Sequence, residues 1–159
     1  MKEKSDLQHL LSLPVIIAAL GYFVDIYDLL LFGIVRVPSL KALGLDVDNV
    51  GTMILNFQMV GLLIGGIVWG MLGDKKGRLS VLFGSILVYS LANILCGFLP
   101  ILPFQDKATT YAILRFIAGL GLAGELGAGI TLVSESLPKE LRAIGTSIVA
   151  GFGLLGAVV

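Results

Sequence analysis

Four ionisable side chains lie inside long apolar segments of this sequence: Asp25, Asp28, Arg115 and Glu125. A charge at the centre of a lipid bilayer costs about 2.5–3.5 kcal/mol on insertion scales, so such residues normally face a bundle interior or a wet cavity and mark an ion or substrate path. The alternative is a salt bridge that only fixes helix packing. Since one base cannot neutralise three acids, we favour a role in moving protons or a charged solute.

The spacing of these residues predicts how they meet. Asp25 and Asp28 are three residues apart, so they share one helix face and would titrate as a coupled pair. At a rise of 1.5 Å per residue, Asp28 and Arg115 lie at similar depth and can pair if their helices are neighbours. The candidate residues for substrate binding and proton coupling are Asp25, Asp28, Arg115 and Glu125, with Tyr27 and Gln58 as hydrogen-bonding groups.

The elements that carry these residues are predicted to be membrane-spanning helices. Hydrophobic residues make up 57 % of the chain and charged residues 14 %, whereas soluble domains are typically about 25 % charged. A bilayer core about 30 Å thick needs about 20 apolar residues in a helix. We therefore predict an all-α membrane protein with about five transmembrane helices, at roughly 14–35, 50–72, 79–99, 109–134 and 143–159, behind an N-terminal interfacial segment at 1–13.

The basic residues of the connections predict the orientation, because cytoplasmic loops carry an excess of Lys and Arg. With the N-terminus in the cytoplasm, the inner side receives Lys2, Lys4, Lys75, Lys76, Arg78, Lys139 and Arg142. The outer side then receives only Arg36, Lys41 and Lys107. We expect a multi-pass protein of the cell (cytoplasmic or inner) membrane with its N-terminus inside.

Glycine contributes 21 residues, most of them within the predicted spans. In the second span, Gly61 with Gly65 and Gly66 with Gly70 form two successive G-x-x-x-G pairs. Small residues of this kind let helix backbones approach closely in lipid. We expect close helix packing at most of these glycines.

Other residue patterns argue against an enzyme. The chain has one cysteine, Cys96, and one histidine, His9, so neither a metal cluster nor a Ser-His-Asp set can be assembled. The run from Gly119 to Gly124 spells G-x-G-x-x-G, but it lies inside an apolar span rather than between a strand and a helix. The net charge of zero gives no sign of nucleic-acid binding. We expect no cofactor and no metal.

The connection between the second and third spans is the most specific motif, reading Gly70-Met-Leu-Gly-Asp74-Lys75-Lys76-Gly77-Arg78. Gly77 allows a tight turn, and Asp74 can cap the next helix or meet a positive helix end. With its full spacing after a Gly-rich span, the motif resembles the signature loop of the major facilitator superfamily. Two further segments agree with that family, Arg115-Phe-Ile-Ala-Gly119-Leu-Gly121 and Glu135-Ser-Leu-Pro138-Lys-Glu-Leu-Arg142.

The resemblance implies a fold and a set of roles. The chain would be part of the N-terminal six-helix half of a twelve-helix fold, with the first and fourth helices lining a central cavity. Asp25-Ile-Tyr27-Asp28 and Gly124-Glu125 are similar to the branch of metabolite:proton and phosphate:proton symporters. The same resemblance implies a cytoplasmic gate network made of Gly70, Asp74, Gly77, Arg78, Glu135 and Arg142.

The function implied is secondary active transport in a lipid bilayer, by proton-coupled symport of a small anionic metabolite through alternating access. Symport of inorganic phosphate with protons is one alternative. Because the sequence stops at Val159 within an apolar segment, we also expect a C-terminal truncation. The second alternative is therefore a non-transporting half-module that needs a missing C-terminal half or a partner half.

Overall fold

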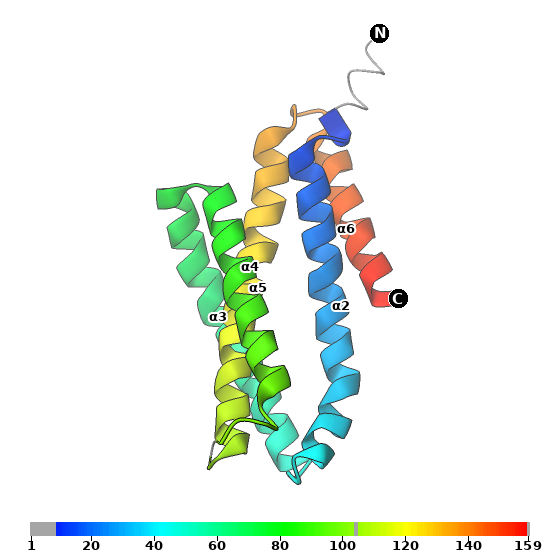
Figure 1. The fold of residues 1–159 in the computed structure, drawn as a ribbon. Helices are drawn as coiled ribbons and strands as arrows, with labels where there is room; N and C mark the ends of the chain where they lie inside the picture. The colour runs from blue at the N-terminus through cyan, green and yellow to red at the C-terminus, as the bar shows by residue number, and fades with distance from the viewer. Residues whose placement is uncertain (1–8, 104, 159) are drawn as a thin grey trace.

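The computed structural model describes residues 9–103 and 105–158, and these form a helical bundle without strands (Figure 1). The predicted all-α fold is confirmed. Helices α2 to α5 are long and apolar enough to cross a membrane, and α6 is apolar but shorter. The bounds are Leu13–Ala42 for α2, Asn49–Lys76 for α3, Arg78–Phe98 for α4, Lys107–Ser136 for α5 and Arg142–Val158 for α6.

The outward faces of the helices carry large apolar side chains. Leu63 of α3 is 68 % exposed, and Leu87 of α4 is 59 % exposed. In water, apolar surface of this extent marks an association site or an aggregation hazard. In lipid it needs no cover, and the helices satisfy their own backbone hydrogen bonds. The chain is therefore built for a bilayer.

Helix α5 is the centre of the bundle. It packs most extensively against α3 and α4 and also contacts α2 and α6. Helix α2 pairs with α6, and it meets the group formed by α3, α4 and α5 mainly through α5 (Figure 1). The seam between α2 and α5 is thus the place where the charged residues of the first and fourth predicted spans can meet.

The contact between α3 and α5 depends on two glycines. A methyl group on Gly61 would collide with the backbone carbonyl of Phe116, and one on Gly65 would collide with the α5 backbone further along. The close packing predicted for this pair is confirmed. Gly66 and Gly70 differ, because no heavy atom lies within 4 Å of where their methyl groups would stand. For them the predicted close packing is absent within the described part of the chain, where they line a hollow beside α5.

Helix α2 is longer than predicted. The sequence predicts an end near residue 35, but the helix continues through Pro38 to Ala42. Proline removes a backbone hydrogen bond and usually stops a helix. Here the extension is held by tertiary contacts: Leu40 is fully buried in a cluster with residues of α3 and α5, and Arg36 donates from Nη1 to the carbonyl of Gly51 at 3.3 Å. A prediction based on the length of apolar segments cannot detect such contacts between helices.

The predicted interfacial segment at 1–13 falls mostly outside the described residues. From His9 onward the chain makes a turn, with the backbone N–H of Ser12 donating to the carbonyl of His9 at 3.2 Å. Helix α2 then begins at Leu13, with Pro14 in its first turn. Proline is tolerated there because its missing N–H would have no partner within the helix.

The two ends of the bundle carry different connections. The start of α2, the link from α3 to α4 and the link from α5 to α6 lie together at one end (Figure 1). The links from α2 to α3 and from α4 to α5 lie at the other end. The basic residues predicted to be cytoplasmic therefore gather at one end, as far as the structure describes them.

Helix α5 starts at a side-chain cap. The carboxylate of Asp106 accepts hydrogen bonds from the backbone N–H of Thr109 at 3.1 Å and from the Thr109 hydroxyl. These bonds lower the pKa of Asp106, with the side-chain bond as the largest cause. A carboxyl group whose pKa is lower in the folded state stabilises the fold above its ordinary pKa. That stabilisation is lost as the pH falls through the lowered value.

Replacing Asp106 by Ala should fray the first turn of α5, because it removes the acceptor for the Thr109 N–H. We expect amide hydrogen exchange at Thr109 and Thr110 to become roughly three- to tenfold faster at neutral pH, as for loss of a typical cap. Acidifying the unmodified chain below the lowered pKa of Asp106 should likewise weaken the protection of these amides, measured relative to the unfolded chain at the same pH. Asp48→Ala is the matched control, since Asp48 precedes α3 without a side-chain cap bond. Equal exchange in the two variants would contradict the assignment.

Candidate functional site

Two buried carboxyl groups face each other across the seam between α2 and α5. Asp25 is fully buried, and neither of its carboxylate oxygens receives a hydrogen bond from the described residues. Its side chain interacts with that of Glu125, which is 6 % exposed. Two neighbouring carboxyl groups can share one proton. The pair can therefore act as a site that binds and releases a proton.

The second pair joins Asp28 of α2 to Arg115 of α5. Nη1 of Arg115 lies 3.7 Å from Oδ2 of Asp28, so the ion pair predicted from their equal depth is confirmed. The guanidinium carbon stands 3.5 Å from the centre of the Phe32 ring, in a cation–π contact. Nε and Nη1 of Arg115 have no hydrogen-bond partner among the described residues. A buried guanidinium with unsatisfied N–H groups is suited to bind a carboxylate or phosphate.

Helix α4 adds a residue that the sequence analysis did not select. Tyr89 is 8 % exposed, and its side chain interacts with Asp28 and, at longer range, with Asp25 and Arg115. Ser85, one turn before it, is fully buried. Their spacing of four residues places both on one face of α4. That spacing was a usable signal, because the other residues of the helix are largely apolar.

The other two candidates lie in different surroundings. Gln58 of α3 is 2 % exposed, and its side-chain oxygen Oε1 lacks a hydrogen-bond partner among the described residues. Tyr27 is 37 % exposed, and it lines a hollow next to Gly156 of α6 rather than the seam that contains Asp25. The structure therefore buries Gln58 beside α5 and turns Tyr27 toward the other side of α2.

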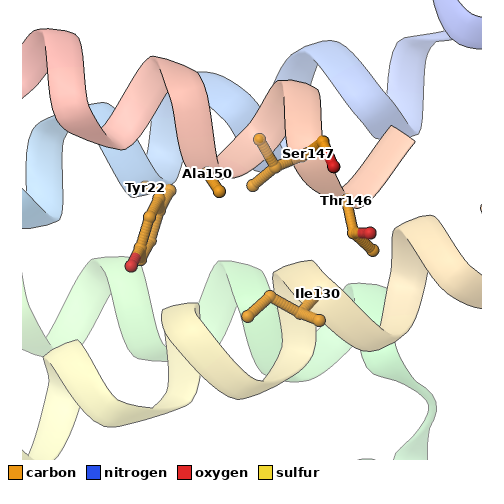
Figure 2. Close-up of a pocket in the computed structure, with 6 residues that line it drawn as sticks. Tyr22, Ile130, Thr146, Ser147 and Ala150 are labelled. Atoms are coloured by element: carbon orange, nitrogen blue, oxygen red, sulfur yellow. The ribbon is translucent and has the colours of Figure 1, made fainter. Parts of the chain in front are cut away.

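Two hollows lie beside α2 and α5, and one of them is lined by a charged residue. One, of about 310 Å³, lies between α2, α4 and α5 and is lined by Gly21, Tyr89 and Glu125 among apolar neighbours. The other, of about 350 Å³, lies between α2, α5 and α6, where Tyr22 faces Ile130 and the hydroxyl side chains of α6 (Figure 2). Its hydroxyl groups come from Tyr22, Thr146 and Ser147. A small solute could enter either hollow, and the first gives it access to Glu125.

At the end of the bundle with the predicted cytoplasmic connections, Arg78 bridges two acids. Its Nη2 lies 2.8 Å from Oδ1 of Asp74, and its Nε lies 3.7 Å from Oε1 of Glu135. This arrangement ties together the ends of α3, α4 and α5. Asp74 thus pairs with Arg78, and the residue at the cap position of α4 is Gly77. Arg142 donates from Nε to the carbonyl of Leu137 at 3.1 Å.

Gly77 is the single residue between α3 and α4. Its φ of +87° lies in the left-handed region that favours glycine, which confirms the predicted tight turn. Gly70 faces open space. The turn at Gly77 lets α4 follow α3 directly, which brings Arg78 to Asp74. Among the described residues, no three His, Cys, Asp or Glu side chains are grouped so that they could hold a metal ion.

The chain is similar to one family of membrane transporters and to several of its named members. The family model of the Major Facilitator Superfamily matches residues 18–159. A "Putative metabolite transport protein" of Haemophilus influenzae is 35 % identical over 146 residues, which cover 88 % of this chain and 33 % of that protein. The niacin transporter NiaP of Acinetobacter baylyi is 32 % identical over 143 residues, covering 90 % and 31 %. No solved structure is a significant match.

A plant relative extends the range of named substrates. The low affinity inorganic phosphate transporter 4 of Petunia hybrida is 34 % identical over 153 residues, which cover 89 % of this chain and 28 % of that protein. The chain therefore spans about a third of the length of the relatives it matches.

Proposed function

The chain belongs to the Major Facilitator Superfamily, and on that basis we propose that it forms the N-terminal helical part of a proton-coupled symporter for a small anionic metabolite. Its relatives are named as transporters of metabolites, niacin and phosphate. Niacin carries a carboxylate, and phosphate is itself an anion. The buried guanidinium of Arg115 has the chemistry to attract either of them.

The observation that carries the proposal is the meeting of Asp25, Asp28, Arg115 and Glu125 at the seam between α2 and α5. With all four groups ionised, the cluster carries two net negative charges. An anion that approaches Arg115 competes with Asp28 for the guanidinium and adds more negative charge. Protons taken up by the Asp25–Glu125 pair offset that charge, so anion and proton enter the site together.

We propose that the charged network around Arg78 is a gate on the cytoplasmic side. Its ion pairs to Asp74 and Glu135 join the ends of three helices. Both acids are more than half exposed, so each pair contributes little by itself. Ion pairs of this strength can form and break as the gate closes and opens during alternating access. In this proposal the N-terminus also lies in the cytoplasm, where the basic connections belong.

Uptake into proteoliposomes tests the proposal. The chain is measured alone, and also as a chimera in which it replaces the matching third of the Haemophilus influenzae relative. We expect an inward proton gradient to drive uptake of labelled nicotinate or a similar small carboxylate, and a protonophore to abolish that uptake. Uptake by the chimera alone would identify the chain as a module of a longer transporter. No uptake in either form, with correct membrane insertion, would refute the proposal.

Phosphate:proton symport is the second candidate, supported by the Petunia hybrida relative. Counterflow separates the two functions, because vesicles loaded with unlabelled solute accumulate label only if the carrier accepts both molecules. Labelled phosphate that exchanges against phosphate but not against carboxylates would favour phosphate as the substrate. Exchange among carboxylates only would favour the first candidate.

A further inference from the structure

The geometry points to Gly21 as a positioning residue for the carboxyl pair: its missing side chain is what lets the Glu125 carboxyl reach Asp25. This inference rests on the proposed proton-coupling role of the pair. It assigns a function to a residue of α2 that carries no chemistry of its own.

A methyl group placed on Gly21 would lie 2.7 Å from Oε1 of Glu125 and 3.4 Å from its Cδ. Real Cβ atoms essentially never come as close as the first of these distances. Gly21 is one helical turn before Asp25, so both residues lie on the same face of α2. The Glu125 carboxyl therefore occupies the volume that any larger side chain at position 21 would fill.

The atoms that such a methyl group would meet belong to the end of one flexible side chain. The three nearest heavy atoms all belong to Glu125. This differs from Gly61, where the obstacle is a backbone carbonyl of α5. An alanine at position 21 can therefore be accommodated by swinging the Glu125 carboxyl aside, while the helices keep their places. Alanine also favours a helix over glycine.

The charged and titratable groups around Glu125 define what its displacement changes. Helix α2 brings Asp25, which interacts with Glu125 directly, and Asp28, which pairs with Arg115 of α5. Helix α4 brings Tyr89 into the same hollow. Among the described residues, the charged residue of α6, Arg142, lies at the end of that helix. Moving Glu125 thus chiefly breaks its contact with Asp25.

Infrared titration of the 159-residue chain in lipid bilayers tests the inference. The carbonyl stretch of protonated carboxyl groups is followed against pH in the unmodified chain and in Gly21→Ala, with Asp25→Asn and Glu125→Gln to assign the bands. We expect Gly21→Ala to move the titration midpoint of the pair by about half a pH unit or more. Gly33→Ala is the matched control, because it lies on the same helix with nothing within 4 Å; its titration should equal that of the unmodified chain.

Rescue separates positioning from a general structural effect. Glu125→Asp shortens the side chain by one methylene, so the double variant Gly21→Ala/Glu125→Asp should return the midpoint toward that of the unmodified chain. A Gly21→Ala titration identical to that of Gly33→Ala, or a shift that Glu125→Asp leaves in place, would overturn the inference. Circular dichroism and the melting temperature show whether each variant is folded.

Uptake measurements keep the two claims apart. If the titration responds as expected but the unmodified chimera shows no proton-driven uptake, the proposed function fails while the positioning role of Gly21 stands. If uptake is proton-driven but Gly21→Ala titrates and transports like Gly33→Ala, the positioning role fails while the proposed function stands.

Discussion

Replacing Asp25 by Asn should reduce proton-driven uptake by on the order of 100-fold, at the lower end of what a proton-transferring group contributes. Asparagine has nearly the same size, so it fits the fully buried position. Its amide cannot take up and release a proton, and it would instead donate a hydrogen bond to Glu125. The measurement is initial uptake of labelled solute with and without an inward proton gradient. Exchange of solute at equal pH should persist, because that reaction needs no net proton movement.

Asp48→Asn is the control for this experiment, since Asp48 is an exposed residue in the connection before α3. Insertion of both variants is checked by their yield in the membrane fraction. Undiminished proton-driven uptake in Asp25→Asn would remove Asp25 from the mechanism. If the variant loses both solute exchange and proton-driven uptake, Asp25 serves folding or solute binding rather than proton coupling.

Replacing Gly61 by Val should destabilise the bundle by about 3 kcal/mol or more, at the upper end of the cost of overpacking. A Cβ atom at this position collides with the backbone carbonyl of Phe116. Because that atom belongs to a helix backbone, it cannot rotate away, and α3 and α5 must move apart. The measurement is thermal unfolding in detergent micelles, where the melting temperature should fall by several degrees.

Gly66→Val tests the same substitution on the same helix at a position with open space around it. Its stability should change by no more than about 0.5 kcal/mol, as for a surface site. Similar melting temperatures for the two variants would contradict the packing of α3 against α5. A large loss in Gly66→Val alone would place the packed face of α3 on the opposite side.

This pair of glycines also shows how far sequence reasoning reaches. Both G-x-x-x-G pairs have the same spacing, and only the three-dimensional structure tells which pair is in close contact with α5. The apolar windows located the spans because bilayer thickness limits their length. The length of the apolar segment did not predict the end of α2. There the helix continues past Pro38, and Leu40 and Arg36 contact other helices.

The contacts of the charged residues could likewise be predicted only in part from the sequence. Equal depth was enough to predict the pair of Asp28 with Arg115, because depth follows from position along a helix. The contact of Asp25 with Glu125, and the access of Tyr89 to Asp28, depend on which faces of three helices turn inward. Residue spacing within one helix does not determine that rotation relative to its neighbours.

The distance along the chain between Asp28 and Arg115 has a consequence for biogenesis. The two residues are 87 positions apart, and a ribosome adding about 5–20 residues per second needs roughly 4–17 s to cover that distance. During this interval α2 has emerged with its acids while the cation that will accompany them does not yet exist. We therefore expect the first helix to enter lipid less efficiently from a nascent chain that ends before α5 than from one that includes α5.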